Sequence, residues 1–240
     1  MVFGKNSTMK YSAVIFDLFG TLVATFSSRK YKNLLCSMAA AVGASPDHFS
    51  RLWLETCNDR WSGAFATTEA NIEHICHKLG LAAAPQSIAE AARVRLPVVE
   101  ESMQPREDAA DTLKRLRTAG CRIGLISDCS MEVPLHWPCT PFAPLVDVPI
   151  FSCTAGIRKP DPRIYRLACE RLGVAPPQCI YVGDGGSREL SGASAVGMHP
   201  VLIRVPHENN DAHRIEAEEW QGTRISKLSE VLAVAGLPGQ

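Results

Sequence analysis

The chain has 240 residues, enough for one substantial core or for a core that carries a smaller insertion. Its 25 basic and 25 acidic residues balance to a formal net charge of zero, which argues against a nucleic-acid partner. No apolar run reaches the roughly 20 residues that span a bilayer, so no membrane partner is expected.

Nine cysteines are scattered along the chain, and no two of them form a CxxC pair. This pattern argues against a disulfide framework and a thiolate zinc site, and it favours a reducing compartment. The polar stretch Met1–Ser12 lacks the apolar segment of a signal peptide. We therefore expect a cytoplasmic protein.

The first predicted element is a short apolar run, Ala13 to Phe16, that leads directly into Asp17 before the chain turns at Gly20. Such a run predicts a buried strand of a parallel sheet. Ligands of open parallel sheets bind beyond the carboxyl ends of the strands, where Asp17 is expected. A carboxylate at that place can attack an electrophile, hold a metal ion, or both.

Helical spacing of apolar residues dominates the next part of the chain, and no strand is predicted there. We interpret residues 26–104 as a helical cap inserted between the two parts of a core, 1–25 and 105–240. The expected helices cover the stripe from Tyr31 to Met38, residues 46–56, Thr67 to Leu79, and about Gln86 to Val99.

A stretch between the second and third of these helices, Arg60-Trp61-Ser62-Gly63-Ala64-Phe65, is interpreted as a loop. In one interpretation it faces a ligand, with Arg60 as a substrate-binding residue. In the other it is a tight turn whose rings pack into the cap. His74 and His77 lie one helical turn apart without a nearby acid, and we assign them to the surface.

Helices and strands alternate again after Pro105. This alternation predicts the α/β class, with a doubly wound parallel sheet between helices. The proline-rich passage from Pro134 to Pro149 is expected to be irregular. The expected elements are helices at 109–119, 164–172 and 229–235, and strands at 121–126, 149–152, 179–182 and 201–203.

Three of the predicted strands end in polar residues, namely Asp17, Ser127-Asp128 and Asp184. Each alone is also what a strand-to-helix turn prefers. Parallel strands bring these ends to one edge of the sheet, where two aspartates repel each other unless a cation lies between them. Oxygen ligands of this kind suit Mg²⁺.

Lys159 stands in a stretch that its neighbouring prolines stiffen, Lys159-Pro160-Asp161-Pro162. A fixed ammonium beside two carboxylates and a hydroxyl is suited to binding a phosphoryl group. The glycines around Asp184, in Gly183–Gly186, allow the backbone to approach a ligand closely.

Taken together, these stretches resemble the haloacid dehalogenase-like (HAD) hydrolase superfamily over nearly the whole chain. The resemblance implies a Rossmann-like core with an inserted helical cap. The motifs that carry it are Asp17-Leu18-Phe19-Gly20-Thr21, Ser127, Lys159 with Pro160-Asp161-Pro162, and Gly183-Asp184 with Gly192-Ala193 and Gly197-Met198.

The same resemblance implies the roles of the site residues. Asp17 would be the nucleophile, forming a covalent aspartyl intermediate that water hydrolyses, while the cap shuts over the substrate. The catalytic set is completed by Ser127 and Lys159, which bind the transferred group, and Asp128 is assigned to substrate binding. Mg²⁺ would be held by Asp17, the backbone carbonyl of Phe19, and Asp184.

Two residues depart from the superfamily's phosphatases. Phe19 stands where they carry an aspartate that protonates the leaving group, a role worth about 10²–10⁴ in rate. Either another group supplies the proton, with Asp128 or a cap residue as the candidate donor, or the leaving group needs none, or the enzyme is slow. Glu189 stands where the fourth motif usually has a second aspartate.

Three functions remain open at this point. We favour a Mg²⁺-dependent phosphatase acting on a small phosphorylated metabolite, as a monomer or homodimer. The alternative is a 2-haloacid dehalogenase, whose family members carry an aromatic residue at the place of Phe19 and need no metal. Those enzymes lack an aspartate at the position that Asp184 occupies here, and they prefer asparagine at the position of Asp128. A non-catalytic binding protein is the third, disfavoured because the motif residues are present.

Overall fold

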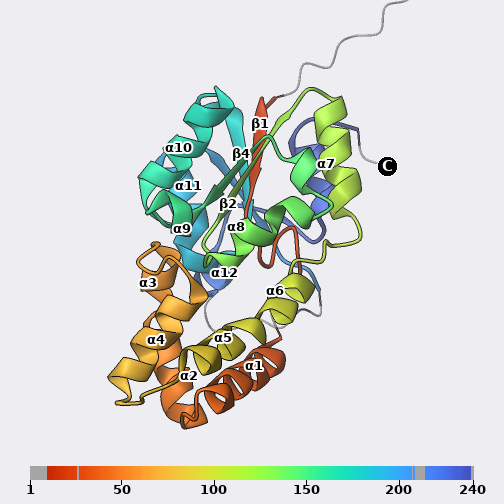
Figure 1. The fold of residues 1–240 in the computed structure, drawn as a ribbon. Coiled ribbons are helices and arrows are strands. Elements are labelled where there is room, and N and C mark those ends of the chain that lie inside the picture. Colours follow the sequence, from red (N-terminus) through yellow and green to blue (C-terminus); the bar gives the residue numbers. More distant parts are fainter. Residues whose placement is uncertain (1–9, 26, 207, 209–213, 239–240) are drawn as a thin grey trace, which may run out of the picture.

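The computed structural model describes residues 10–25, 27–206, 208 and 214–238. The polar stretch expected at the amino terminus lies outside the described residues up to position 9. Figure 1 shows a core, in which helices surround a sheet, above a separate group of helices. None of the described helices is both long and apolar enough to cross a membrane.

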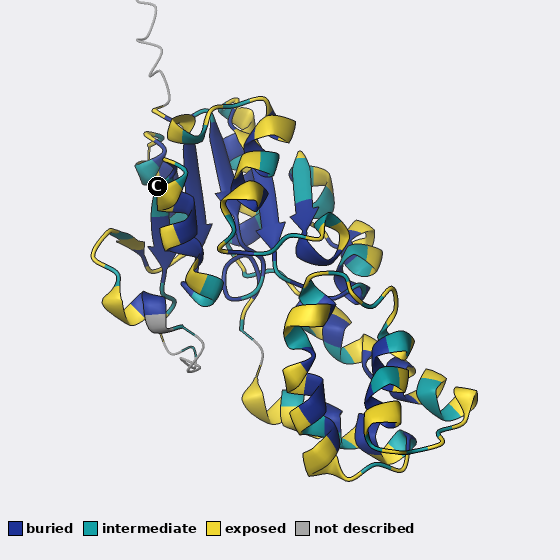
Figure 2. Cartoon of the chain, turned by 90° about the vertical axis from the view of Figure 1, so that its left-hand side faces the viewer, coloured by how far each residue is buried: buried dark blue, intermediate teal, exposed yellow. Residues whose placement is uncertain are grey.

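The core is built on a six-stranded parallel sheet in the order β3-β2-β1-β4-β5-β6. Figure 2 shows its central strands as buried. This confirms the predicted α/β class and adds an edge strand, β6, that the sequence did not predict. The strands are β1 Ala13–Phe16, β2 Arg122–Ser127, β3 Val148–Phe151, β4 Cys179–Gly183, β5 His199–Ile203 and β6 Thr223–Ile225.

Helices cover both faces of this sheet because the side chains of each strand alternate in direction. Along β1, Val14 and Phe16 pack in the apolar cluster under α7 and α13, whereas Ala13 and Ile15 pack in the cluster under α10 and α11. The helices of the core are α7 Ala109–Thr118, α8 Glu132–His136, α9 Ser152–Ala155, α10 Pro162–Leu172, α11 Glu189–Ala195, α12 Ile215–Glu219 and α13 Val231–Val234.

The three central strands are level with one another at their carboxyl ends. Phe16 is paired with Leu125 of β2 and with Val182 of β4. Asp17 follows Phe16 directly. Ser127 comes two residues after Leu125, and Asp184 comes two residues after Val182. The register therefore gathers the polar ends of the strands at one edge of the sheet, as predicted.

The helical cap forms its own apolar cluster, in which Trp53, Ile72 and Met38 are fully buried. At its end, Val99 and Met103 belong to the core cluster instead. The limits 26–104 stay a proposal. The helices of this part are α1 Ser28–Ala41, α2 Pro46–Glu55, α3 Cys57–Trp61, α4 Thr68–Lys78, α5 Pro85–Arg93 and α6 Leu96–Ser102.

Three local predictions were wrong. The single helix expected from residue 86 to 99 is divided into α5 and α6, because Pro97 has no N–H to donate to the Arg93 carbonyl at the end of α5. Arg60 and Trp61 lie in the short helix α3 rather than in a loop. The proline-rich passage contains α8, which tolerates Pro134 because the first turn of a helix needs no N–H donor.

Candidate active site

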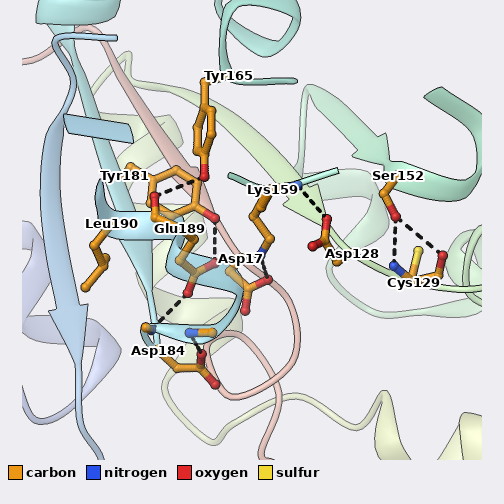
Figure 3. Close-up of polar contacts among 12 residues, drawn as sticks. Asp17, Asp128, Cys129, Ser152, Lys159, Tyr165, Tyr181, Asp184, Glu189 and Leu190 are labelled. Carbon is orange, nitrogen blue, oxygen red and sulfur yellow. Dashed lines mark hydrogen bonds and ion pairs between the residues drawn. The ribbon is translucent and has the colours of Figure 1, made fainter. Parts of the chain in front are cut away.

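A buried ammonium group joins two of the motifs at the edge of the sheet. Lys159 Nζ lies 2.6 Å from Asp17 Oδ1 and 2.5 Å from Glu189 Oε2, and all three side chains are nearly inaccessible to solvent. Figure 3 shows Lys159 reaching across to Asp17 from a neighbouring loop. The structure thus brings together the predicted nucleophile and the predicted lysine.

The loop that carries Lys159 is fixed at both ends. The backbone N–H of Lys159 donates to Asp128 Oδ1 at 3.0 Å, and this bond holds the loop against the end of β2. Two residues further on, Asp161 caps α10 by accepting from the backbone N–H of Arg163 at 2.9 Å. The lysine side chain is therefore held in the site and is not solvated.

Glu189 is the first residue of α11 and is fully buried. Its Oε2 accepts from the Tyr181 hydroxyl at 2.8 Å, and its Oε1 accepts from the Gly185 N–H at 3.0 Å. A side chain at Gly183 would collide with this carboxylate, at 2.2 Å from Oε1. Glu189 is thus locked in place as a partner of Lys159.

One ammonium shared by two buried carboxylates cannot neutralise both. Burial, with a smaller contribution from nearby Asp184, raises the pKa of Asp17 to about 6, although Lys159 opposes the shift. Burial likewise raises the pKa of Glu189 above its ordinary range. Burial alone would lower the pKa of Lys159, but its two carboxylate partners more than reverse this, so the ammonium stays charged.

Asp184 directly follows β4, and its carboxylate pairs with an arginine side chain. Its Oδ1 accepts from the Gly186 N–H at 2.8 Å, and its Oδ2 lies 2.6 Å from Arg214 Nη2. Arg214 directly precedes α12, and its side chain is about nine-tenths buried. Sequence reasoning missed this residue, because nothing in its neighbourhood distinguishes it from the other arginines.

Mg²⁺ was expected at Asp17, the backbone carbonyl of Phe19 and Asp184, and the structure adds the carboxylate of Glu189 to the two aspartates. Ligand oxygens of Asp17, Asp184 and Glu189 lie within 4.8 Å of one another, and carboxylate oxygens suit that ion. Each carboxylate, however, already has a cation at 2.5–2.6 Å, from Lys159 or Arg214. As arranged, the cluster does not fit a divalent ion.

Ser127 and Asp128 supply polar atoms that have no protein partner. Ser127 is fully buried, and its Oγ has no oxygen or nitrogen partner among the described residues. Asp128 Oδ2 is buried and unpaired in the same sense. Buried polar atoms are normally satisfied, so both atoms remain open to a partner that the protein does not supply. Asp128 lines the cavity between the core and the cap, whereas Ser127 is not among its lining residues.

A cavity of about 270 Å³ opens between the core and the cap. Asp17, Lys159 and Asp184 line it from the core, together with Asp128 and Arg214. Trp61 and Arg95 line it from the cap. This volume suits a small molecule rather than a polymer.

Arg60 does not reach this cavity. Its guanidinium is buried in the cap, where Nη1 donates to the Trp53 carbonyl at 2.6 Å and to Asn71 Oδ1 at 3.0 Å. Burial lowers the pKa of Arg60. The arginine that faces the cavity from the cap is instead Arg95, which sequence reasoning did not single out.

Arg95 also joins the cap to the core. Its Nε lies 2.5 Å from Glu132 Oε1 in α8, an oxygen that accepts a second hydrogen bond from the Thr68 hydroxyl at 2.6 Å. Burial raises the pKa of Glu132, but Arg95 outweighs this and holds it at about 2. The pair therefore stays ionised at neutral pH.

Comparison with known proteins agrees with this architecture. A profile of haloacid dehalogenase-like hydrolases matches residues 11–197. The chain belongs to the haloacid dehalogenase-like hydrolase family. This confirms the resemblance drawn from the motifs, and it identifies the protein as a HAD hydrolase.

Named relatives of this hydrolase fall into two groups. It is 28% identical to (S)-2-haloacid dehalogenase 4A of Burkholderia cepacia over 92% of this chain and 94% of the relative. It is also 28% identical to phosphatase MT3486 of Mycobacterium tuberculosis, over 81% and 88% of the two chains. The solved 2-haloacid dehalogenase of Pseudomonas syringae pv. Tomato DC3000 shares the fold, with a TM-score of 0.70 and 22% identity, covering 94% and 98% of the chains.

Proposed function

We propose that the protein is a 2-haloacid dehalogenase-like hydrolase that uses Asp17 as a nucleophile and needs no metal ion. The observation that carries the proposal is Phe19, which lines the cavity two residues after the nucleophile. A phenyl ring cannot protonate a leaving group. A halide ion leaves without a proton, whereas the alkoxide leaving group of an ordinary phosphate ester is helped by one.

In the first step, a carboxylate oxygen of Asp17 attacks the carbon that bears the halogen. A carbon–oxygen bond forms, the carbon–halogen bond breaks, and the halide leaves with the electron pair. Lys159 holds Asp17 Oδ1 and leaves the other oxygen to attack. The product of this step is an ester between Asp17 and the acid.

In the second step, water adds to the side-chain carbonyl carbon of Asp17. The bond from that carbon to the substrate oxygen breaks, which releases a 2-hydroxy acid. One proton of the water goes to the new hydroxyl group and the other to solvent, so the Asp17 carboxylate is restored. The ammonium of Lys159 again offsets the negative charge that develops on Asp17.

The substrate carboxylate would be bound by groups that the protein leaves available. Ser127 Oγ, which lacks an oxygen or nitrogen partner among the described residues, is a suitable donor. The relationship to dehalogenases over nearly the full length of the chain supports the same class of substrate.

A phosphatase is the second candidate, and the residue types of the acidic cluster favour it, although their present pairing with Lys159 and Arg214 does not. Asp17, Asp184 and Glu189 together offer oxygen ligands of the kind that Mg²⁺ uses in phosphoryl transfer. The similarity to a phosphatase of Mycobacterium tuberculosis points the same way. This candidate requires that Arg214 give way to the ion and that the leaving group need no acid at Phe19.

A parallel assay separates the two candidates. The purified protein is incubated with 2-chloropropionate, and with an aryl phosphate whose leaving group is good enough to need no acid, each with Mg²⁺ or with a chelator. Chloride release that is unchanged by the chelator is the expected result. Phosphate release that depends on Mg²⁺, without chloride release, would replace the proposal by the phosphatase.

A further inference from the structure

The fourth motif and helix α12 form one interlocked unit. Glu216 of α12 is buried, and its carboxylate accepts from the backbone N–H groups of Leu190 at 3.0 Å and Ser191 at 2.7 Å. These N–H groups lie in the first turn of α11, whose positive end a carboxylate stabilises. This contact fixes α12 against the segment that contains Asp184 and Glu189.

A second contact holds the same helix against the loop. Gly185 has a φ of +87°, and a side chain there would lie 2.9 Å from both Cβ and the backbone N of Ala217. Glycine is needed at this position for the close approach as well as for the backbone angle. Glu216 and Ala217 of α12 thus contact the fourth motif on the two sides of Glu189.

Arg214 is the residue that this unit directs into the site. It lies two residues before Glu216, lines the cavity, and pairs with Asp184 Oδ2 at 2.6 Å. The pair passes directly against Gly20, where an added Cβ would lie 1.8 Å from Asp184 Oδ2 and 2.5 Å from Arg214 Nη2. The nucleophile loop therefore accommodates the guanidinium beside Asp184.

We propose that Arg214 is a resident cation of the active site, and that it takes the place beside Asp184 that a divalent ion would need. Mg²⁺ bound to Asp184 at about 2.0–2.1 Å would lie beside the guanidinium, and the two cations would repel each other. With Lys159 on Asp17 and Glu189, the three buried carboxylates are left with one net negative charge. The inference rests on the metal-independent reaction proposed above, because the phosphatase candidate would require Arg214 to leave Asp184.

Arg214 is a positioning residue in this view. It acts through Asp184, because no contact to the nucleophile is found for it among the described residues. It sets the charge around Asp17 without a metal ion, so that Asp184 does not repel an anionic substrate. A divalent ion competes with the guanidinium for the site.

The test is a direct measurement of Mn²⁺ binding to the metal-stripped full-length protein, without substrate, by the electron paramagnetic resonance signal of the free ion. Arg214→Gln should raise the affinity for Mn²⁺ at least about tenfold, equivalent to about 1.4 kcal/mol. Adding Asp184→Asn to that variant should remove the gain. Arg214→Lys, which keeps a positive charge, should bind Mn²⁺ as weakly as the wild type.

Arg166→Gln is the matched control, since Arg166 is an exposed arginine of α10 and should leave Mn²⁺ binding unchanged. Equal Mn²⁺ affinity in the wild type and in Arg214→Gln would overturn the inference. If Arg214→Gln does not fold, Mn²⁺ binding to the wild-type protein tests the inference alone. Saturable binding at micromolar Mn²⁺ would also overturn the inference. Neither readout involves turnover, so failure of the inference can be told apart from failure of the dehalogenase assay.

Discussion

At the scale of single residues, the chemistry of the site rests on how one lysine divides its charge between two carboxylates. Lys159 contacts both Asp17 and Glu189, and the pKa of Asp17 remains raised to about 6. Only the carboxylate form of Asp17 is nucleophilic. The value belongs to the group of interacting residues and would be read from a pH profile as an apparent pKa.

We predict that kcat/KM falls as the pH is lowered through about 6, because Asp17 then becomes protonated. Unfolding is not the cause: the folded pKa lies above the ordinary value of 3.8, so protonation between these values favours the folded state. Initial rates between pH 4.5 and 8, with circular dichroism at each pH, check this. A flat profile with intact structure would contradict the role of Asp17 as the titrating nucleophile.

Asp17→Asn should reduce turnover by about 10³-fold or more, as expected when a nucleophile is removed. The fold should persist, because Lys159 keeps Glu189 as its partner at 2.5 Å. Chloride release and thermal melting measure the two effects. Asp111→Asn, at an exposed site on α7, is the control and should change neither. Substantial activity in Asp17→Asn would remove the assignment.

Phe19→Asp should shift the balance of reactions. It places a carboxylic acid where a leaving group can be protonated, and general acid catalysis is worth about 10²–10⁴ in rate. We expect hydrolysis of an alkyl phosphate to rise in this variant while dehalogenation falls. Phe19→Leu is the control for loss of the ring. If the aspartate variant gains no phosphatase activity, the missing proton donor does not limit that reaction.

At the scale of elements, the cap meets the core through a glycine. Gly63, just after α3, has a φ of +79°, and a side chain there would lie 2.2 Å from the Cys153 carbonyl oxygen in α9. Figure 1 shows α3 directly beneath α9. Because Trp61 lines the cavity two residues earlier, the closeness of this contact sets the position of one cavity wall.

Gly63→Ala should therefore displace α3 and lower kcat/KM by about 10–100-fold, the effect expected of a misplacement near 1 Å. Gly80→Ala is the matched control: its φ of +68° imposes similar backbone strain, but no atom lies within 4 Å of the added Cβ. The comparison of steady-state kinetics separates strain from contact. Equal losses in the two variants would show that the approach to Cys153 is unimportant.

Elements with strong local signals were predictable from the sequence. The motif ends of β1, β2 and β4 lie where alternation placed them, because apolar runs ended by Asp or Gly leave little freedom. The division between α5 and α6 and the short α3 were not predictable, because a few residues of tertiary packing decide them. Arg60 was assigned to substrate binding on composition alone, and its burial in the cap depends on how α2, α3 and α4 pack to bring Trp53 and Asn71 to its guanidinium.

Arg214 illustrates the same limit within the site. Asp17, Lys159 and Asp184 could be predicted as neighbours, because parallel strands and a stiff loop bring them together. The arginine comes from the stretch after β5, and its place depends on how Glu216 and Ala217 pack against the fourth motif. Contacts of that kind have no local signature in the sequence.

At the scale of the whole molecule, the two apolar interiors are separate. The cluster around Trp53 holds the cap together, while the sheet with its two clusters forms the core. Arg95 and Glu132 connect the two parts by a buried ion pair. Such an arrangement allows one part to open without the other.

We predict that Ile72→Ala destabilises the cap by about 2–5 kcal/mol, the usual cost of emptying a fully buried aliphatic site. Native-state hydrogen exchange should show faster exchange in α1, α4 and α5, with unchanged protection in β1 and β4. Ile180→Ala, at a fully buried position of β4, is the control and should accelerate exchange throughout the core. Uniform loss of protection in Ile72→Ala would mean that the cap and the core unfold as one unit.

The level ends of β2, β1 and β4 have a consequence for how this chain can change by insertion and deletion. Adding or removing one residue within β1 would turn Asp17 to the other face of the sheet, because the side-chain period of a strand is two. Beyond the turn at Gly20 no such constraint acts, and a whole helical segment is accommodated there. Strand length therefore fixes the placement of Asp17, while changes in the inserted segment, which supplies Trp61 and Arg95, can reshape the cavity without moving that residue.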